Sequence, residues 1–131
     1  GRCSVCHSGN LQSDFSFHSI GTPQGAFGPH SRHRDIGRAA VTLKQEELFK
    51  FRTPPLNEVS KSAPFGHNGI FTTMREVIVH HVNPVQIFLD GKVKNTYSYG
   101  KVLDSRAPIL ATISIRNDGD IEALISFMNA L

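Results

Sequence analysis

The sequence predicts a mostly α domain with long irregular connections. Two segments, 73–82 and 117–131, carry the signals of stable helices. Elsewhere turn-forming residues are frequent, with 11 Gly and 7 Pro among 131 residues, and both types interrupt regular structure. A chain of this length supports one domain around one core, so we expect residues 1–131 to form a single unit.

The first of these helices begins with a recognisable cap. Thr73 and Glu76 have the spacing of a capping box, in which each side chain binds the backbone N–H of the other. The helix should end near Asn83-Pro84, because proline disfavours a helical conformation at the residue before it. Spacing of i, i+3, i+4 and i+7 then places four residues on one apolar face: Met74, Val77, Ile78 and His81. His80 is turned about 100 degrees away from that face.

The closing segment predicts a second amphipathic helix, capped by Asn117 or Asp118. Its apolar stripe consists of Ile121, Leu124, Ile125, Met128 and Leu131. Segment 44–51 is long enough for one or two helical turns. Segment 8–41 is expected to be mostly irregular. Segment 85–106 holds no single apolar period and contains the turn signal Asp90-Gly91, so we expect it to be irregular as well.

Charge and hydropathy exclude two classes of partner. The formal net charge is +3, the pI is about 9.1, and the basic residues are scattered along the chain. No run of them predicts a nucleic-acid surface. No segment is apolar enough over sufficient length to span a membrane, so we expect no transmembrane helix.

The two cysteines carry the clearest chemical signal. Both lie in Cys3-Ser4-Val5-Cys6-His7, the Cys-x-x-Cys-His pattern that attaches haem c. Each thiol forms a thioether with one porphyrin vinyl group, and the histidine that follows binds the iron from one side. We therefore predict covalent haem held by Cys3 and Cys6, with His7 as an iron ligand. The buried haem would also complete the core of a domain with few helices.

Three other interpretations of the cysteines are possible. A thioredoxin-like dithiol needs a βαβ setting, which the sequence does not predict. A zinc site needs two more ligands, and no second ligand pair has the usual spacing. A disulfide between Cys3 and Cys6 would close a very small loop.

The second iron position decides between electron transfer and ligand chemistry. His81 is the first candidate for the second iron ligand, since it lies on the apolar face against which a haem would pack. His80 is the main competing candidate, and its alternative role is that of a surface residue. Packing is the expected role of Met74 and Met128. The remaining histidines considered are expected to brace loops or lie on the surface: His18, His30 and His33. Two histidine ligands should give a lower potential than a histidine and a methionine.

Several ordered motifs resemble one family, the bacterial dihaem cytochrome c peroxidases and their MauG-type relatives. From residue 3 to residue 131 the chain is similar to their C-terminal haem domain. The motifs that carry the resemblance are Gly1 to Gly9 around the cysteines, Phe17-His18-Ser19-Ile20-Gly21, Asp35-Ile36-Gly37-Arg38 with Val41-Thr42, Phe51-Arg52-Thr53-Pro54-Pro55-Leu56, Ala63-Pro64-Phe65-Gly66-His67-Asn68-Gly69, Thr73-Met74-Arg75-Glu76-Val77 and the closing helix.

The resemblance implies roles for individual residues. The family's second iron ligand, a Met in the peroxidases and a Tyr in the MauG type, falls on His81. The family's calcium site, built partly from backbone carbonyls, falls on Ser62 and Pro64. His67 matches the histidine of the family's motif at residues 63–69. Its role would be at the haem, at a domain interface or in a structural hydrogen bond. The chain also departs from the family's usual Leu-Arg-Asn-Val, having Asn57 in place of the Arg.

The resemblance implies a function as well. We expect an electron-transfer haem domain of a peroxidase-like oxidoreductase that uses hydrogen peroxide as acceptor. Its partners would be an N-terminal haem domain, or another chain of the same protein, and a small redox protein as electron donor. The location would be periplasmic, and the chain would be part of a larger protein. The alternatives are a MauG-like enzyme that oxidises a protein, and a non-enzymatic electron carrier or haem sensor.

Overall fold

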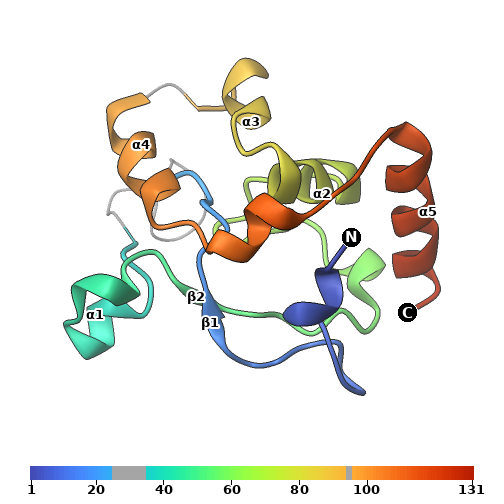
Figure 1. The fold of residues 1–131 in the computed structure, drawn as a ribbon, viewed down its shortest axis with the longest axis horizontal. Helices are drawn as coiled ribbons and strands as arrows, with labels where there is room; N and C mark the ends of the chain where they lie inside the picture. The colour runs from blue at the N-terminus through green and yellow to red at the C-terminus, as the bar shows by residue number, and fades with distance from the viewer. Residues whose placement is uncertain (25–34, 94–95) are drawn as a thin grey trace.

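The computed structural model describes residues 1–24, 35–93 and 96–131, with the side chains of 96–98 left out. Its α-helices are α1 (Ala39–Thr42), α2 (Met74–Val82), α3 (Gln86–Leu89), α4 (Thr96–Asp104) and α5 (Asp118–Asn129). Short 3₁₀ turns are η1 (Cys3–Val5), η2 (Gln45–Glu47), η3 (Val59–Lys61) and η4 (Pro108–Thr112). The strands β1 (Phe17–His18) and β2 (Phe51–Arg52) pair antiparallel. The mostly α prediction is confirmed (Figure 1).

Helix α2 forms as its capping signals predict. The Thr73 hydroxyl accepts the backbone N–H of Glu76 at 3.2 Å, and the Glu76 carboxylate accepts the backbone N–H of Thr73 at 3.4 Å. The helix ends at Asn83, directly before Pro84. Because local contacts fix both ends of α2, the position of every residue along it could be predicted from the sequence.

Removing this cap should measurably destabilise the domain. We expect Thr73→Ala to lower the free energy of unfolding by about 1 kcal/mol, since the backbone N–H of Glu76 then loses its acceptor. Chemical denaturation followed by circular dichroism measures the change. Thr73→Ser keeps the hydroxyl and should stay close to the parent, so equal losses in the two variants would contradict the capping role.

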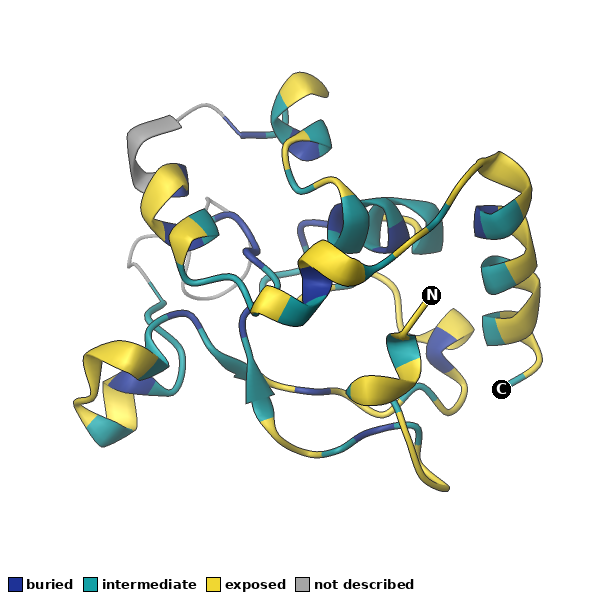
Figure 2. Ribbon diagram, viewed as in Figure 1, coloured by how far each residue is buried: buried dark blue, intermediate teal, exposed yellow. Residues whose placement is uncertain are grey.

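Helix α5 packs beside α2 at one side of the molecule (Figure 1). Asn117 caps it by accepting the backbone N–H of Asp120 at 3.0 Å. Arg75 of α2 forms ion pairs with Asp118, at 3.1 Å, and with Glu122. Of the predicted apolar stripe only Ile121 is buried, and its other members are half-buried. Figure 2 shows this half-buried side of α5 turned toward the rest of the chain.

The prediction that segment 85–106 is irregular is wrong. It contains both α3 and α4, and it supplies much of the core. In α4, Tyr99, Val102 and Leu103 have helical spacing, while Ile87 belongs to a separate short helix. One apolar period could not fit both helices because the turn at 90–91 changes the phase between them. Segment 44–51 contains the single 3₁₀ turn η2 and the first residue of β2, and the short helix α1 precedes it.

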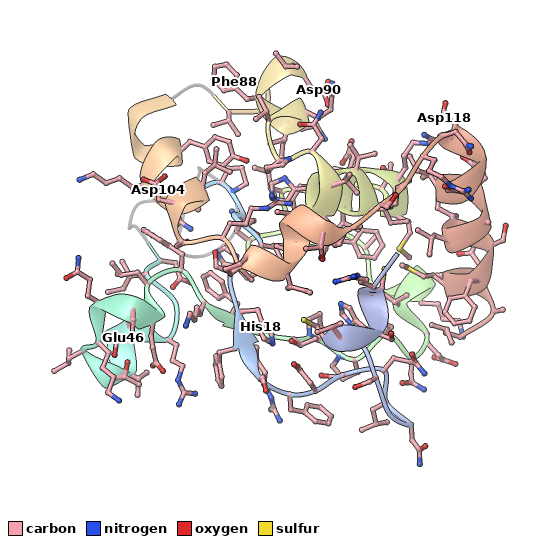
Figure 3. The ribbon with its side chains drawn as sticks, viewed as in Figure 1. His18, Glu46, Phe88, Asp90, Asp104 and Asp118 are labelled. Carbon is pink, nitrogen blue, oxygen red and sulfur yellow. The ribbon has the colours of Figure 1, made fainter. Side chains whose placement is uncertain are left out.

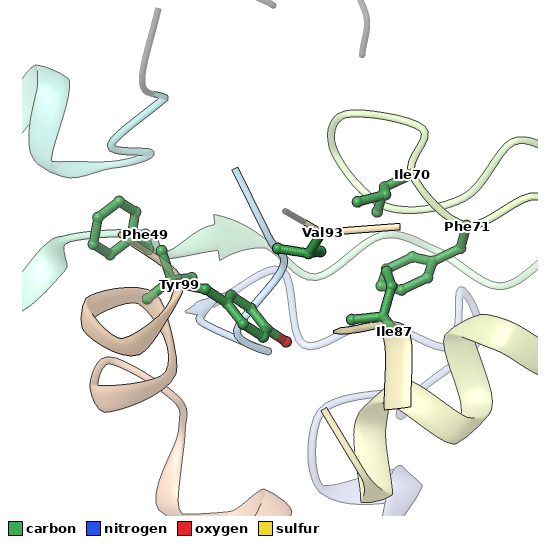
Figure 4. Packing of buried hydrophobic residues seen from close by; sticks show 7 residues of the cluster. Phe49, Ile70, Phe71, Ile87, Val93 and Tyr99 are labelled. Atoms are coloured by element: carbon green, nitrogen blue, oxygen red, sulfur yellow. The ribbon is translucent and has the colours of Figure 1, made fainter. Parts of the chain in front are cut away.

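The main core joins residues that are far apart in the sequence. Its buried members are Phe49, Ile70, Phe71, Ile87, Val93, Tyr99 and Val102, and the labelled ones point toward one another in Figure 4. The Tyr99 hydroxyl donates to the carbonyl of Pro84 at 2.6 Å, which ties α4 to the end of α2. Among the helices that the structure describes, none has the length and apolar character needed to cross a membrane.

Candidate haem site

The cysteine motif forms a tight turn at the start of the chain. Cys3 and Cys6 lie in and directly after η1, and the backbone N–H of His7 donates to the carbonyl of Cys3 at 2.9 Å. Both thiols are free and half-buried. Burial, followed by the nearby Asp14 carboxylate, raises the pKa of the Cys6 thiol. The turn thus presents two unpaired sulfurs and one imidazole from five consecutive residues.

The ring of His7 is anchored at one nitrogen. Its Nδ1–H donates to the backbone carbonyl of Gln12 at 3.0 Å, so Nε2 carries the free lone pair. Histidines that bind metals usually hold their second nitrogen in this way, which fixes both the tautomer and the ring orientation. Burial lowers the pKa of His7, although the bond to Gln12 acts in the opposite direction. His7 is therefore arranged as a neutral ligand.

His81 has the same arrangement in the last turn of α2. Its Nδ1–H donates to the carbonyl of Val77 at 2.7 Å, which again leaves Nε2 free. The residue is half-buried, and burial lowers its pKa, with further lowering by the charges of His7 and Arg106. The charge of His7, 74 positions earlier in the sequence, thus contributes to the lowered pKa of His81.

The competitor His80 belongs to the core, and its interpretation as a surface residue is wrong. It is 1% exposed. Its Nε2–H donates to the carbonyl of Ile20 at 3.1 Å, and its ring lies 4.7 Å from that of Phe71. Burial, with help from the charges of His81 and Arg106, lowers the pKa of His80 to about 3. Segment 19–21 packs on the face of α2 that carries His80, so α2 is covered on two faces. The apolar periodicity of α2 predicts only one of these two faces.

His18 braces the loop that follows the cysteines, as predicted for a loop histidine. Its Nε2–H donates to the Asp14 carboxylate at 2.8 Å. Figure 3 labels His18 on strand β1. Ligand atoms of Cys6, Asp14 and His18 lie within 4.8 Å of one another, a grouping that the sequence analysis missed because the spacing matches no known metal motif. The direct bond between Asp14 and His18 already occupies two of these three atoms, so we interpret the pair as structural.

Asp14 gives this loop a pH-dependent stability. Burial opposes its ionisation, but hydrogen bonds from His18, Thr53 and the backbone of Ser16 outweigh that effect and lower its pKa from 3.8 to about 2. A carboxyl with a lowered folded-state pKa stabilises the fold above its ordinary pKa and stops doing so as the pH falls through its folded-state value. We therefore expect Asp14→Asn to lower the melting temperature at neutral pH.

The same variant should converge with the parent under acid. Between the ordinary pKa of 3.8 and about 2, the Asp14 carboxylate becomes protonated and its advantage disappears. Thermal unfolding of both proteins across this pH range measures the convergence. A gap in melting temperature that stayed constant with pH would contradict the role of the ionised carboxylate.

The remaining site candidates lie away from these imidazoles or outside the described residues. His67 stacks on Phe51, with ring centroids 3.6 Å apart and planes 11° apart, and burial lowers its pKa. Met74 and Met128 are half-buried on their helices. His30 and His33 lie outside the described residues.

The two predicted calcium ligands are accessible. Ser62 and Pro64 are exposed and lie directly after η3. In the part of the chain that the structure describes, neither of these two backbone carbonyls accepts a hydrogen bond. These two oxygens are therefore available to a cation.

Taken together, these donors fit a covalently attached haem. Two free thiols and an anchored imidazole come from one turn, and a second anchored imidazole comes from α2. The apolar sides of α2 and α5 remain half-buried around this region, as at Val77 and Leu124. A flat apolar group packed against these residues would increase their burial.

Comparison with known proteins gives the relationship. The chain is 32% identical over 99 residues to the cytochrome-c peroxidase IdrP1 of Pseudomonas sp. (strain SCT), an alignment that covers 58% of this chain and 26% of the relative. It is 26% identical to the methylamine utilization protein MauG of Paracoccus denitrificans, with 98% of this chain covered and 38% of the relative. The predicted resemblance to the cytochrome c peroxidases and MauG is confirmed. No protein-family model matches it.

The fold agrees with this family. A crystal structure titled as a MauG-like protein associated with microbial copper homeostasis superposes with a TM-score of 0.69, covering 98% of this chain and 42% of that one at 21% identity. At this identity the likeness shows the fold alone. The chain spans about a quarter of the length of IdrP1, so it corresponds to one part of such proteins.

Proposed function

We propose that this chain is the C-terminal, electron-transfer haem domain of a dihaem peroxidase-like oxidoreductase. Cys3 and Cys6 would hold the haem covalently, and the Nε2 atoms of His7 and His81 would bind its iron. The observation that carries the proposal is that both imidazoles donate Nδ1–H to a backbone carbonyl, at 3.0 Å and 2.7 Å, and so keep Nε2 free.

When bound in this way, haem c accepts and donates one electron at a time. The protein's own contribution is to fix both ligands and to exclude other molecules from the iron. Anchoring at Nδ1 holds each ring in one orientation, and the apolar surroundings of α2 limit access by water. With His7 and His81 both bound to the iron, this domain would leave peroxide to react at another haem.

The family relationship supports the wider setting. The curated relatives are much longer than this chain, which favours a partner haem domain, in the same protein or in another chain, as the electron acceptor. A small redox protein would supply the electrons and hydrogen peroxide would be the final acceptor. Haem c is attached outside the cytoplasm, so a periplasmic location follows from the proposed cofactor.

Visible and near-infrared spectra test the proposal. The chain, exported in a host that attaches haem c, should give a c-type reduced spectrum and a low-spin oxidised spectrum without the charge-transfer band of a methionine ligand. A high-spin oxidised spectrum would overturn the assignment of His81 and the electron-transfer role. The absence of any haem band would overturn the cofactor itself and favour zinc or redox roles for the cysteines.

The second candidate function is protein oxidation of the MauG type. The sequence relationship to MauG favours it, whereas His81 stands where that type has a tyrosine. Stoichiometric peroxide added to the full-length protein distinguishes the two. Oxidation of a partner protein would support the MauG type, and oxidation of a reduced small cytochrome would support the peroxidase type. Redox cycling without reaction toward peroxide would favour a plain electron carrier.

Calcium binding is proposed at the free carbonyls of Ser62 and Pro64. Two neutral oxygens from one loop supply only part of a calcium shell, which contains six to eight oxygens, so the partner domain would provide others. We expect calcium to raise the melting temperature of the full-length protein and a chelator to reverse the increase. Unchanged melting curves in the two conditions would contradict the site.

A further inference from the structure

We propose that Arg106 is a positioning residue that holds His81 in place as an iron ligand. The proposal rests on the proposed function, since it takes His81 to be that ligand. Arg106 follows α4, in the segment that the sequence analysis expected to be irregular. It lies 25 positions beyond His81 and matches none of the recognised motifs.

The contact between the two residues is direct. The Nη2 atom of Arg106 donates to the backbone carbonyl of His81. The last four carbonyls of any helix have no partner within that helix, and His81 is the second-last residue of α2. Arg106 therefore satisfies the open carbonyl of the candidate ligand itself.

The charge of Arg106 strengthens this contact. Helix C-termini carry partial negative charge, which cations stabilise most strongly when they are partly buried. Arg106 is half-buried, and no carboxylate within the described residues forms an ion pair with it. Its Nε atom is buried without a partner. The end of α2 is thus the main group that this cation stabilises.

A second segment holds Arg106 against α2. The backbone N–H of Ala107 donates to the carbonyl of Ser19 at 2.8 Å, and the hydroxyls of Ser19 and Ser105 are hydrogen-bonded at 2.9 Å. Gly21 has a φ of +75°, and a Cβ there would lie 3.4 Å from the Arg106 Cδ. The carbonyl of Ile20 in this same segment accepts the bond from His80. Segment 19–21 therefore contacts both Arg106 and His80, the residue before His81.

This arrangement fixes His81 at two points. Its ring is held by the carbonyl of Val77 and its backbone by Arg106. Without Arg106 the carbonyl of His81 would lose this hydrogen bond in the final turn of α2. His81 would then leave the iron more often, and an external ligand could take its place.

Cyanide competition in the oxidised haem-loaded chain tests the proposal. In Arg106→Met we expect cyanide to displace His81 about tenfold faster than in the parent, as for loss of one charge-assisted hydrogen bond. Arg106→Lys keeps a cation and a donor and should restore part of the difference. Arg116→Met is the matched control, because the Arg116 side chain is 78% exposed and, within the described residues, its only ion pair is with Asp120, at 3.2 Å.

The outcomes separate this proposal from the proposed function. A high-spin parent spectrum would show that His81 is not a ligand, and both would fail. A low-spin parent with equal cyanide rates in Arg106→Met would overturn the role of Arg106 alone. If Arg106→Met does not fold, the rate at which cyanide displaces His81 is compared between Arg106→Lys and the parent. Equal rates would overturn the proposal, and a faster rate in Arg106→Lys would support it. In a His81→Ala background, Arg106→Met should change nothing, and an effect there would show that Arg106 does not act through His81.

Discussion

Replacing His81 with methionine is expected to raise the reduction potential of the haem on the order of 0.2 V, within the roughly 0.8 V range that axial ligands cover. A thioether donates less electron density to the iron than an imidazole, so it favours the reduced state. Spectroelectrochemical titration of the parent and of His81→Met measures the shift. His81→Ala should instead leave the sixth position open and give a high-spin oxidised spectrum.

His67→Gln is a suitable control for these variants. His67 is an exposed histidine stacked on Phe51, and its replacement should leave both the potential and the spin state unchanged. A His81→Met protein with the potential and spectrum of the parent would show that another residue holds the iron. In that case His80 would be the next residue to replace, because its Nδ1 is buried without a hydrogen-bond partner among the described residues.

The sequence predicted those parts of the fold that depend on local interactions. The cap of α2 joins residues only three positions apart, and the start of α5 depends on Asn117 and the third residue after it. Helical spacing then placed His81 on a particular face of α2. The cysteine motif is equally local, since its turn is closed by a hydrogen bond between Cys3 and His7.

The parts that the sequence analysis missed depend on contacts between distant segments. His80 is buried because segment 19–21 covers it. The residue pattern of α2 does not predict this contact, and neither does the pattern of segment 19–21. The same holds for Arg106, whose role emerges only when α4 and the end of α2 come together. Segment 85–106 was misread because two short helices of different phase produce no common period.

These contacts connect the core to the candidate site. Phe71 contacts the His80 ring, and His80 is followed directly by His81 on α2. The core therefore supports the second face of the helix that carries His81, the proposed iron ligand.

Replacing Phe71 with alanine is expected to give the largest loss of stability, about 3–5 kcal/mol. Phe71 is 1% exposed, and its backbone exchanges two hydrogen bonds with Phe65, at 2.7 and 3.2 Å. Denaturant unfolding of the oxidised protein measures the loss. Phe127→Ala is the control, since that ring is 55% exposed and its removal should change stability by less than about 0.5 kcal/mol.

The spectrum of the same variant separates packing from ligation. If the core only supports α2, Phe71→Ala should keep the low-spin spectrum under native conditions, because His81 retains its bonds to Val77 and Arg106. Cyanide should displace His81 faster only as the denaturant concentration approaches the unfolding transition. A high-spin spectrum in the absence of denaturant would instead mean that the cavity left by Phe71→Ala moves α2 itself. The orientation of His81 would then depend on core packing as directly as on its two hydrogen bonds.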